Sequence, residues 1–279
     1  MQARNVLDHN YTSMALAFTQ VDAFADSPFT GNPAAVFVLN EFPGDDFLLN
    51  VAREMNLSET AFLVRTGANE FDLRWFTPGG EVDLCGHATL GSAHVLFDSS
   101  AVSGKGVKFN TRSGVLTVGR NQDGSMTMDF PAEPAVGRPR PANLETILGA
   151  PVSWYGENRM DALVQLAEPG WVRALDPDLS EIARMPVRGL IVTATGDSPE
   201  YDFISRFFAP QLGVPEDPVT GSAHCALAPF WHQRLGRANL VAFQASARGG
   251  RVRMLHKDDR VLLSGKALTV LRGELLVDP

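Results

Sequence analysis

Apolar residues recur along this chain in two rhythms, which separate short strands from a few helices. Alternating or continuous apolar runs predict strands at 17–24, 36–39, 61–64, 71–76, 107–110, 115–119, 125–130, 162–166, 190–194, 201–208, 241–245, 251–256, 260–266 and 267–276. The clearest amphipathic helix is expected over 45–56, where apolar residues share one face and acidic residues occupy the start. Shorter helices are expected over 143–148 and 178–184.

Two further helices are apolar on all sides, which predicts that they are buried. They are expected over 88–97 and 222–235, and Pro229 inside the second predicts a kink or a shortened first part. Similar stretches lead into both helices. The first is FTP at 76–78 followed by DLCGHATLGSAH at 83–94, and the second is FAP at 208–210 followed by EDPVTGSAHCAL at 216–227. The first turn of a helix has unpaired N–H groups and a partial positive charge. Two such helix starts beside polar loops indicate a site for a carboxylate.

The order of elements repeats, which indicates an internal duplication. Each half runs strands, helix, strands, buried helix, strands, with the first half over about 15–130 and the second over about 131–265. Residues 1–14 are mixed and polar, and they lack the apolar middle of a secretion signal. We interpret them as a loose N-terminal extension. The predicted architecture is therefore two similar lobes.

Composition excludes several classes of protein. The 279 residues are 44% hydrophobic and 20% charged, with a net charge of −8 and no basic cluster, so nucleic acid is not expected as a partner. No apolar run approaches the length of a transmembrane helix, and a membrane association is not expected. The two cysteines form no CxxC motif, which favours a reducing compartment and a cytoplasmic location.

Four residues have side chains suited to proton transfer or substrate binding. Glu59 lies between an apolar helix and an apolar strand, where partial desolvation would raise its pKa toward neutrality, or else it is an exposed turn glutamate. His87 would shuttle a proton at the first helix start, or merely cap it. Asp217 precedes a proline in the second polar loop and could simply cap the turn. Ser222 is either the N-cap of its helix or a hydroxyl held against a substrate carboxylate.

Metal and nucleotide chemistry have little support in the sequence. His87 and His94 are seven residues apart, about 10 Å along a helix, which is too far to chelate one ion, and His224 and His232 fail in the same way. There is no HExxH, GxGxxG or Walker motif. We therefore expect neither a metal nor a cofactor.

Five sequence blocks, in order, resemble the PhzF-like family, the phenazine-biosynthesis isomerase group of the diaminopimelate-epimerase-like fold. They are GNP at 31–33, NLSET at 56–60, FTP at 76–78, CGHAT at 85–89 and EDPVTGSA at 216–223. The resemblance implies an α+β fold of two similar lobes, each a mixed, mostly antiparallel sheet curled around a central helix. It also implies that the last strand, 266–279, completes the first lobe. Members are commonly homodimers without a cofactor, so a homodimer is expected.

The same resemblance implies roles for individual residues. Glu59 takes the place of the family's acid/base, while His87, Asp217 and Ser222 would bind substrate or relay protons. Asn32, Gly86, Thr220 and Gly221 are expected to bind substrate. The implied function is a cofactor-independent isomerase that moves a proton on a small carboxylic acid in the cleft between the lobes.

Two alternatives remain open at this point. Related epimerases and racemases use two opposed cysteines, one at each helix start; here Cys85 fills the first position but Thr220 fills the second, and Cys225 lies deeper along its helix. An amino-acid epimerase or racemase using Cys85 is one alternative. A non-catalytic metabolite-binding protein on the same scaffold is the other.

Overall fold

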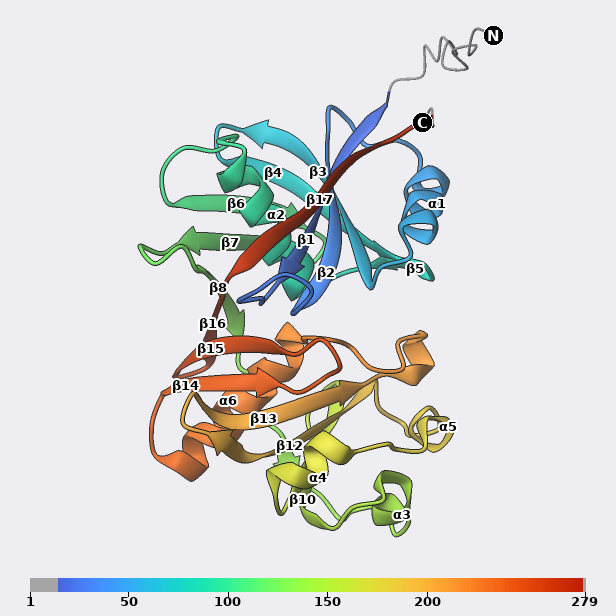
Figure 1. Ribbon diagram of the computed structural model, residues 1–279, viewed down its shortest axis with the longest axis vertical. Coiled ribbons are helices and arrows are strands. Elements are labelled where there is room, and N and C mark those ends of the chain that lie inside the picture. Colours follow the sequence, from blue (N-terminus) through green and yellow to red (C-terminus); the bar gives the residue numbers. More distant parts are fainter. Residues whose placement is uncertain (1–14, 278–279) are drawn as a thin grey trace, which may run out of the picture.

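The computed structural model describes residues 15–277 and consists of two lobes of strands and helices, stacked one above the other in Figure 1. The prediction of an α+β fold with two similar lobes, each a mixed sheet curled around a central helix, is confirmed. The expected extension at 1–14 lies outside the described residues.

The N-terminal lobe contains the first eight strands, two helices and the last strand of the chain. Its strands are β1 (Leu16–Ala23), β2 (Asn32–Leu39), β3 (Glu59–Gly67), β4 (Glu70–Thr77), β5 (Gly80–Val82), β6 (Gly106–Thr111), β7 (Gly114–Arg120), β8 (Met126–Pro131) and β17 (Ala267–Leu275). Its helices are α1 (Asp45–Met55) and α2 (Gly86–Asp98).

The C-terminal lobe repeats this order of elements. Its strands are β9 (Val136–Gly137), β10 (Val152–Glu157), β11 (Asp161–Leu166), β12 (Gly189–Ser198), β13 (Tyr201–Phe208), β14 (Asn239–Gln244), β15 (Gly250–Lys257) and β16 (Arg260–Gly265). Its helices are α3 (Leu144–Leu148), α4 (Pro169–Ala174), α5 (Leu179–Ile182), the 3₁₀ helix η1 (Pro210–Leu212) and α6 (Gly221–Leu235).

Strand pairing is mostly antiparallel, with parallel pairs at equivalent places in the two lobes. β2 pairs in parallel with β3, and β4 with β6; in the second lobe β11 pairs in parallel with β12, and β13 with β14. β17 returns to pair with β1, and β8 pairs with β16 across the junction of the lobes. The sheets of the two lobes are therefore joined by the hydrogen bonds between β8 and β16 as well as by the covalent chain.

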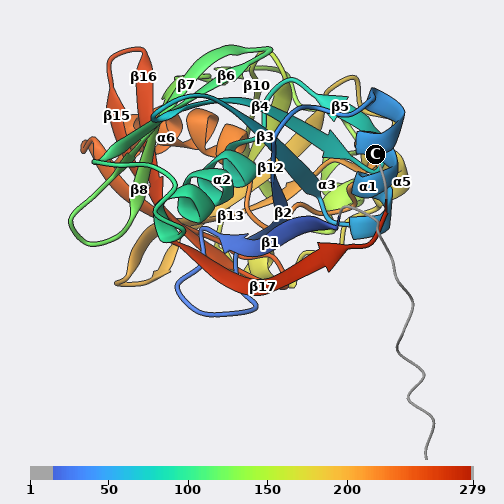
Figure 2. The same cartoon turned by 90° about the horizontal axis from the view of Figure 1, so that it is seen from above.

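The two central helices are buried because their residues are small enough for strands to pack closely around them. In α2 the residues His87–Ala93 are all buried, and Figure 2 shows α2 with strands on both sides. A Cβ on Gly91 would lie 2.5 Å from Cγ2 of Val21, so a larger residue there would push β1 away. The sequence pattern found both central helices because they lack a polar face.

Several local predictions need correction. α6 runs without a break from Gly221 to Leu235, so Pro229 neither shortens it nor divides it. The N-cap of α6 is Thr220, not Ser222, which already lies in the first turn. The strands β5, β9 and β10 and the helix α4 were not predicted, because each is short and their positions depend on tertiary packing.

Candidate active site

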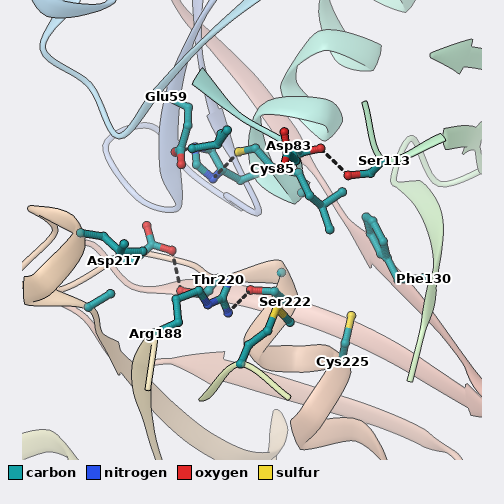
Figure 3. A pocket seen from close by; sticks show the side chains of 18 of the residues that line it. Glu59, Asp83, Cys85, Ser113, Phe130, Arg188, Asp217, Thr220, Ser222 and Cys225 are labelled. Atoms are coloured by element: carbon teal, nitrogen blue, oxygen red, sulfur yellow. Dashed lines mark hydrogen bonds and ion pairs between the residues drawn. The ribbon is translucent and has the colours of Figure 1, made fainter. Parts of the chain in front are cut away.

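A cavity of about 1060 Å³ lies where the starts of α2 and α6 face each other. Glu59, His87, Asp217 and Ser222 all line it, as do Gly86, Thr220 and Gly221. In Figure 3 Glu59 and Cys85 lie on one side of this cavity, while Asp217 and Ser222 lie on the other. The predicted substrate-binding residue Asn32 is fully buried behind this surface and contacts His87 and Asp217.

Glu59 is placed by the end of one helix and the start of one parallel strand. α1 ends at Met55, and its C-cap Asn56 adopts the left-handed conformation (φ 49°, ψ 40°), which turns the chain toward the cavity. Glu59 then opens β3 and pairs with Ala34 of β2. Its side chain is 19% exposed, so the carboxyl reaches the cavity from a largely dry wall. Burial, followed by the negative charge of Asp217, raises the pKa of Glu59 from 4.5 to about 8.

His87 contacts Glu59 as a neutral imidazole. Its Nε2 lies 3.3 Å from Oε2 of Glu59, and burial lowers the pKa of His87 to about 3, so the contact is not an ion pair near neutral pH. On the other side of the ring, Nδ2 of Asn32 lies 3.1 Å from Nδ1 of His87. Nδ2 of Asn32 has two hydrogens and lies closer to Oδ1 of Asp217 and to the carbonyl oxygen of Val219, at 2.7 and 3.0 Å, while Sγ of Cys85 lies 3.5 Å from the same Nδ1 of His87. The neutral imidazole therefore lies between Asn32, Cys85 and Glu59, with Nε2 as the ring nitrogen nearest the carboxyl.

Asp217 is the second acidic group of the site. Its Oδ1 accepts a hydrogen bond of 2.7 Å from Nδ2 of Asn32, and its Oδ2 accepts one of 2.5 Å from Oγ1 of Thr220. Burial raises the pKa of Asp217 to about 6, although these two hydrogen bonds lower it. Gln244, which the sequence did not suggest, holds this loop by donating from Nε2 to the carbonyl of Asp217 and accepting the N–H of Thr220.

Cys85 completes a compact group with Glu59 and His87. Ligating atoms of these three residues lie within 4.8 Å of one another, a grouping of metal-binding residue types that inspection of single helices missed. Metal binding requires a thiolate and a carboxylate. Burial and the charge of Glu59 raise the pKa of Cys85 well above 9, and that of Glu59 is raised as well, so both groups favour their protonated forms. In these protonation states the group can exchange a proton with a molecule in the cavity.

The two helix starts approach each other closely at their glycines. A Cβ built on Gly86 would lie 3.6 Å from Cα of Gly221, and the reverse is also true. Cys85 and Thr220 are the N-caps, and neither side chain caps its own helix. The N–H groups of both first turns are therefore left to other partners at the cavity wall, where they favour an anion.

Arg188 and Asp161 belong to this site, and the sequence analysis missed both. Arg188 lines the cavity directly before β12, and its Nη2 donates to Oγ of Ser222 at 2.9 Å. Asp161, at the start of β11, is fully buried and binds the same guanidinium. In the sequence, each of these residues could have been found as a charged residue immediately before an apolar run.

The comparisons with known proteins assign the chain to a family. The model of the phenazine biosynthesis-like protein family matches residues 21–273. An uncharacterized isomerase of Halalkalibacterium halodurans is 47% identical over 92% of this chain and 97% of its own. An uncharacterized isomerase of Pseudomonas aeruginosa is 48% identical over 94% of this chain and 99% of its own. The chain belongs to the phenazine biosynthesis-like family, and the prediction of a PhzF-like protein is confirmed.

Solved structures agree with this assignment. A PhzF-family protein of Enterococcus faecalis has a TM-score of 0.90 and 41% identity, covering 94% of this chain and 99% of that one. A hydroxyproline epimerase of Agrobacterium vitis has a TM-score of 0.62 at 12% identity, covering 95% and 93%, and shows the shared fold alone. The prediction of an isomerase-type enzyme is confirmed by the named isomerases at 47–48% identity.

Other predictions are left as they were. Within residues 15–277 no helix has the length and hydrophobicity needed to cross a bilayer. The homodimer, the cytoplasmic location, the lobe boundaries, the lack of a metal or cofactor and the roles of individual site residues stay predictions. His94, which the sequence paired with His87, contacts Thr269 and does not line the cavity.

Proposed function

We propose that this protein is a cofactor-independent isomerase in which Glu59 moves a proton between two carbons of a small unsaturated carboxylic acid. The observation that carries the proposal is the position of Glu59, which is a largely buried carboxyl at the cavity wall with a pKa raised to about 8. A carboxyl tuned toward neutrality can both take up and release a proton at physiological pH.

The proposed reaction is a 1,3-proton shift. The carboxylate of Glu59 removes a proton from a carbon next to a double bond, and the electron pair of that C–H bond forms a new double bond. The electrons of the former double bond then take the proton back from Glu59 at the far carbon. No oxidant or co-reactant is needed. His87 lies against the carboxyl of Glu59, with Nε2 3.3 Å from Oε2, and the helix starts at Gly86 and Gly221 disperse negative charge that develops on the substrate.

Cys85 supports the alternative of an epimerase or racemase less well. Its thiol lies within 4.8 Å of Glu59, but its pKa is raised by burial, and its counterpart at the start of α6 is Thr220. Cys225 does line the cavity, yet burial raises its pKa to about 12. Neither thiol is activated as a base, so a two-cysteine reaction is disfavoured.

Deuterium exchange tests the proposal. The protein is incubated in D₂O with a panel of cyclohexene carboxylic acids and α-amino acids, and carbon-bound deuterium and double-bond position are measured by mass spectrometry and NMR. We expect exchange with a double-bond shift that is lost in Glu59→Gln and retained in Cys85→Ser. Exchange at Cα that is lost in Cys85→Ser and retained in Glu59→Gln would establish the epimerase alternative. Binding without any exchange would indicate a non-catalytic protein.

A further inference from the structure

One short segment of the C-terminal lobe contacts both the acidic loop of its own lobe and a turn of the other lobe. Residues 244–249 lead from the end of β14 to β15. Gln244 bonds to the loop of Asp217 as described above, and Oγ of Ser246 donates to the carbonyl oxygen of Pro218 at 2.8 Å. The polar loop before α6 is therefore fixed to this segment.

The same segment reaches the N-terminal lobe through Arg248. Its Nε donates to the carbonyl oxygen of Gly31 at 2.8 Å, and its Nη2 donates to that of Thr30 at 3.1 Å and to Oδ1 of Asp22 at 2.7 Å. The N–H of Gly31 donates to the carbonyl oxygen of Gly249 at 2.6 Å. In Figure 1 the connection between β1 and β2 lies at the edge of the N-terminal lobe that faces β15. Gly31 is therefore bonded to the C-terminal lobe through both its N–H and its carbonyl oxygen.

The turn that Arg248 contacts has an unfavourable backbone conformation. Phe24, Phe29 and Gly31 have φ values of 56°, 69° and 68°, and phenylalanine rarely adopts a positive φ. Oδ2 of Asp22 accepts the N–H of Phe29 at 2.9 Å, and Asp22 is buried with Arg248 as its counter-ion. Because such conformations persist only where neighbouring groups impose them, the turn needs Asp22 and Arg248 to keep its shape.

The residue after this turn connects it to the active site. Asn32 opens β2, and its Nδ2 donates to Oδ1 of Asp217 across the junction of the lobes at 2.7 Å. Two residues further along β2, Ala34 pairs with Glu59. Arg248 does not line the cavity, so it can influence the site only through the turn and the strand that follows it.

We propose that Arg248 is a positioning residue of the active site, which holds the turn before Asn32 from the other lobe and so keeps Asn32 bonded to Asp217. The segment also holds the loop of Asp217 through Gln244, so one piece of chain places both partners of this bond. Without the guanidinium the strained turn relaxes and Asn32 separates from Asp217, whereas Gln244 keeps its own bonds. Only the catalytic consequence, a slower proton transfer once the charge of Asp217 is no longer fixed, rests on the proposed function.

Hydrogen exchange of two side-chain amides tests the proposal without turnover. The Nδ2 hydrogens of Asn32 and the Nε2 hydrogens of Gln244 are followed in D₂O by NMR with the full chain. Arg248→Met should speed exchange at Asn32 about tenfold or more and at Gln244 less than about twofold, because only Asn32 depends on the released turn. Arg253→Met, which removes an ion-paired arginine of β15, is the matched control and should leave both rates unchanged.

A second variant removes the buried charge that Arg248→Met leaves on Asp22. The double variant Asp22→Asn with Arg248→Met keeps an oxygen at position 22 that can accept the N–H of Phe29, and its fold is checked by circular dichroism and thermal melting. We expect the same selective increase at Asn32. The proposal is overturned if Asn32 exchanges at the wild-type rate in the folded variants. It is also overturned if Asn32, Gln244 and the backbone amides of β12 accelerate equally, because that would be a uniform loss of stability.

Kinetics separate this proposal from the proposed function. With an acid that shows Glu59-dependent exchange, Arg248→Met should lower kcat about tenfold or more and change KM less than about twofold, because Arg248 does not line the cavity. A wild-type kcat in Arg248→Met with loss of turnover in Glu59→Gln would overturn the positioning role and leave the proposed function intact. Selectively faster exchange at Asn32 without turnover of any acid would support the positioning role and count against the proposed function.

Discussion

Asn32 of the N-terminal lobe donates a hydrogen bond of 2.7 Å to Asp217 of the C-terminal lobe, so one fully buried amide links the two walls of the site. The same Nδ2 lies 3.0 Å from the carbonyl oxygen of Val219 and 3.1 Å from Nδ1 of His87. One side chain, which does not itself line the cavity, therefore contacts both His87 and the loop that carries Asp217.

Replacing Asn32 with alanine should destabilise the protein by about 1–3 kcal/mol, because Asp217 and the Val219 carbonyl lose a buried donor. Urea denaturation measures the change. Asn69→Ala is the matched control, since Asn69 makes its hydrogen bonds to Ser103 in an exposed loop. Equal losses in the two variants would show that the amide has no special role between the lobes.

Glu59→Gln should lower turnover by roughly 10²–10⁴-fold while the fold and the affinity for carboxylates are retained, because glutamine keeps the shape of the side chain but cannot exchange a proton. Steady-state rates on the substrate identified by deuterium exchange measure the effect. Glu54→Gln changes the same residue type on an exposed position of α1 and should leave the rate unchanged. A rate in Glu59→Gln within a few fold of wild type would remove the residue from the mechanism.

The pH dependence of kcat/KM should rise with pH and level off above about 8, the value to which burial raises the pKa of Glu59. The sign follows from the proposed first step, in which the carboxylate removes a proton and only the deprotonated enzyme reacts. Below the pKa each pH unit should reduce the rate about tenfold. A profile that falls as pH rises toward 8 would instead make Glu59 the initial proton donor.

The stability of the protein should also depend on the titration of Glu59, but stability should fall over the pH range in which activity rises. The pKa of Glu59 is higher in the folded state than its ordinary value of 4.5, so the folded protein binds the extra proton and loses stability as pH rises from 4.5 through 8. We expect Glu59→Gln to unfold at a higher free energy than wild type, by at least about 1 kcal/mol at pH 8, with little difference at pH 4. Denaturant unfolding at both pH values provides the measurement. A difference that is independent of pH would mean that the carboxyl is not buried.

Gly31→Ala should disrupt the turn that leads into Asn32. Gly31 has a φ of +68°, and a Cβ there would lie 2.2 Å from the carbonyl oxygen of Ala23. Gly124→Ala is the control, since Gly124 has a φ of +80° but nothing within 4 Å of the added atom. The control should lose about 1 kcal/mol from the backbone conformation alone. Gly31→Ala should lose clearly more, and similar melting temperatures for the two variants would contradict the close packing.

The sequence alone determined most of the elements and the identity of several site residues. The apolar face of α1, the apolar sequences of α2 and α6 and the polar loops before these two helices are local patterns that can be read along the chain. Glu59, His87 and Asp217 could be singled out because polar residues next to buried segments are unusual. The repeated order of elements in the two halves could also be recognised from the sequence.

The tertiary structure decided which of these residues meet. Asn32 and Asp217, or Asp161 and Arg188, are far apart along the chain, and only the parallel pairing of strands and the opposition of two helix starts bring them together. The raised pKa of Glu59 is likewise a property of the tertiary structure, because its causes are burial and the negative charge of Asp217 in the other lobe. Residue types can indicate proton chemistry, but distance and burial determine which carboxyl can perform it.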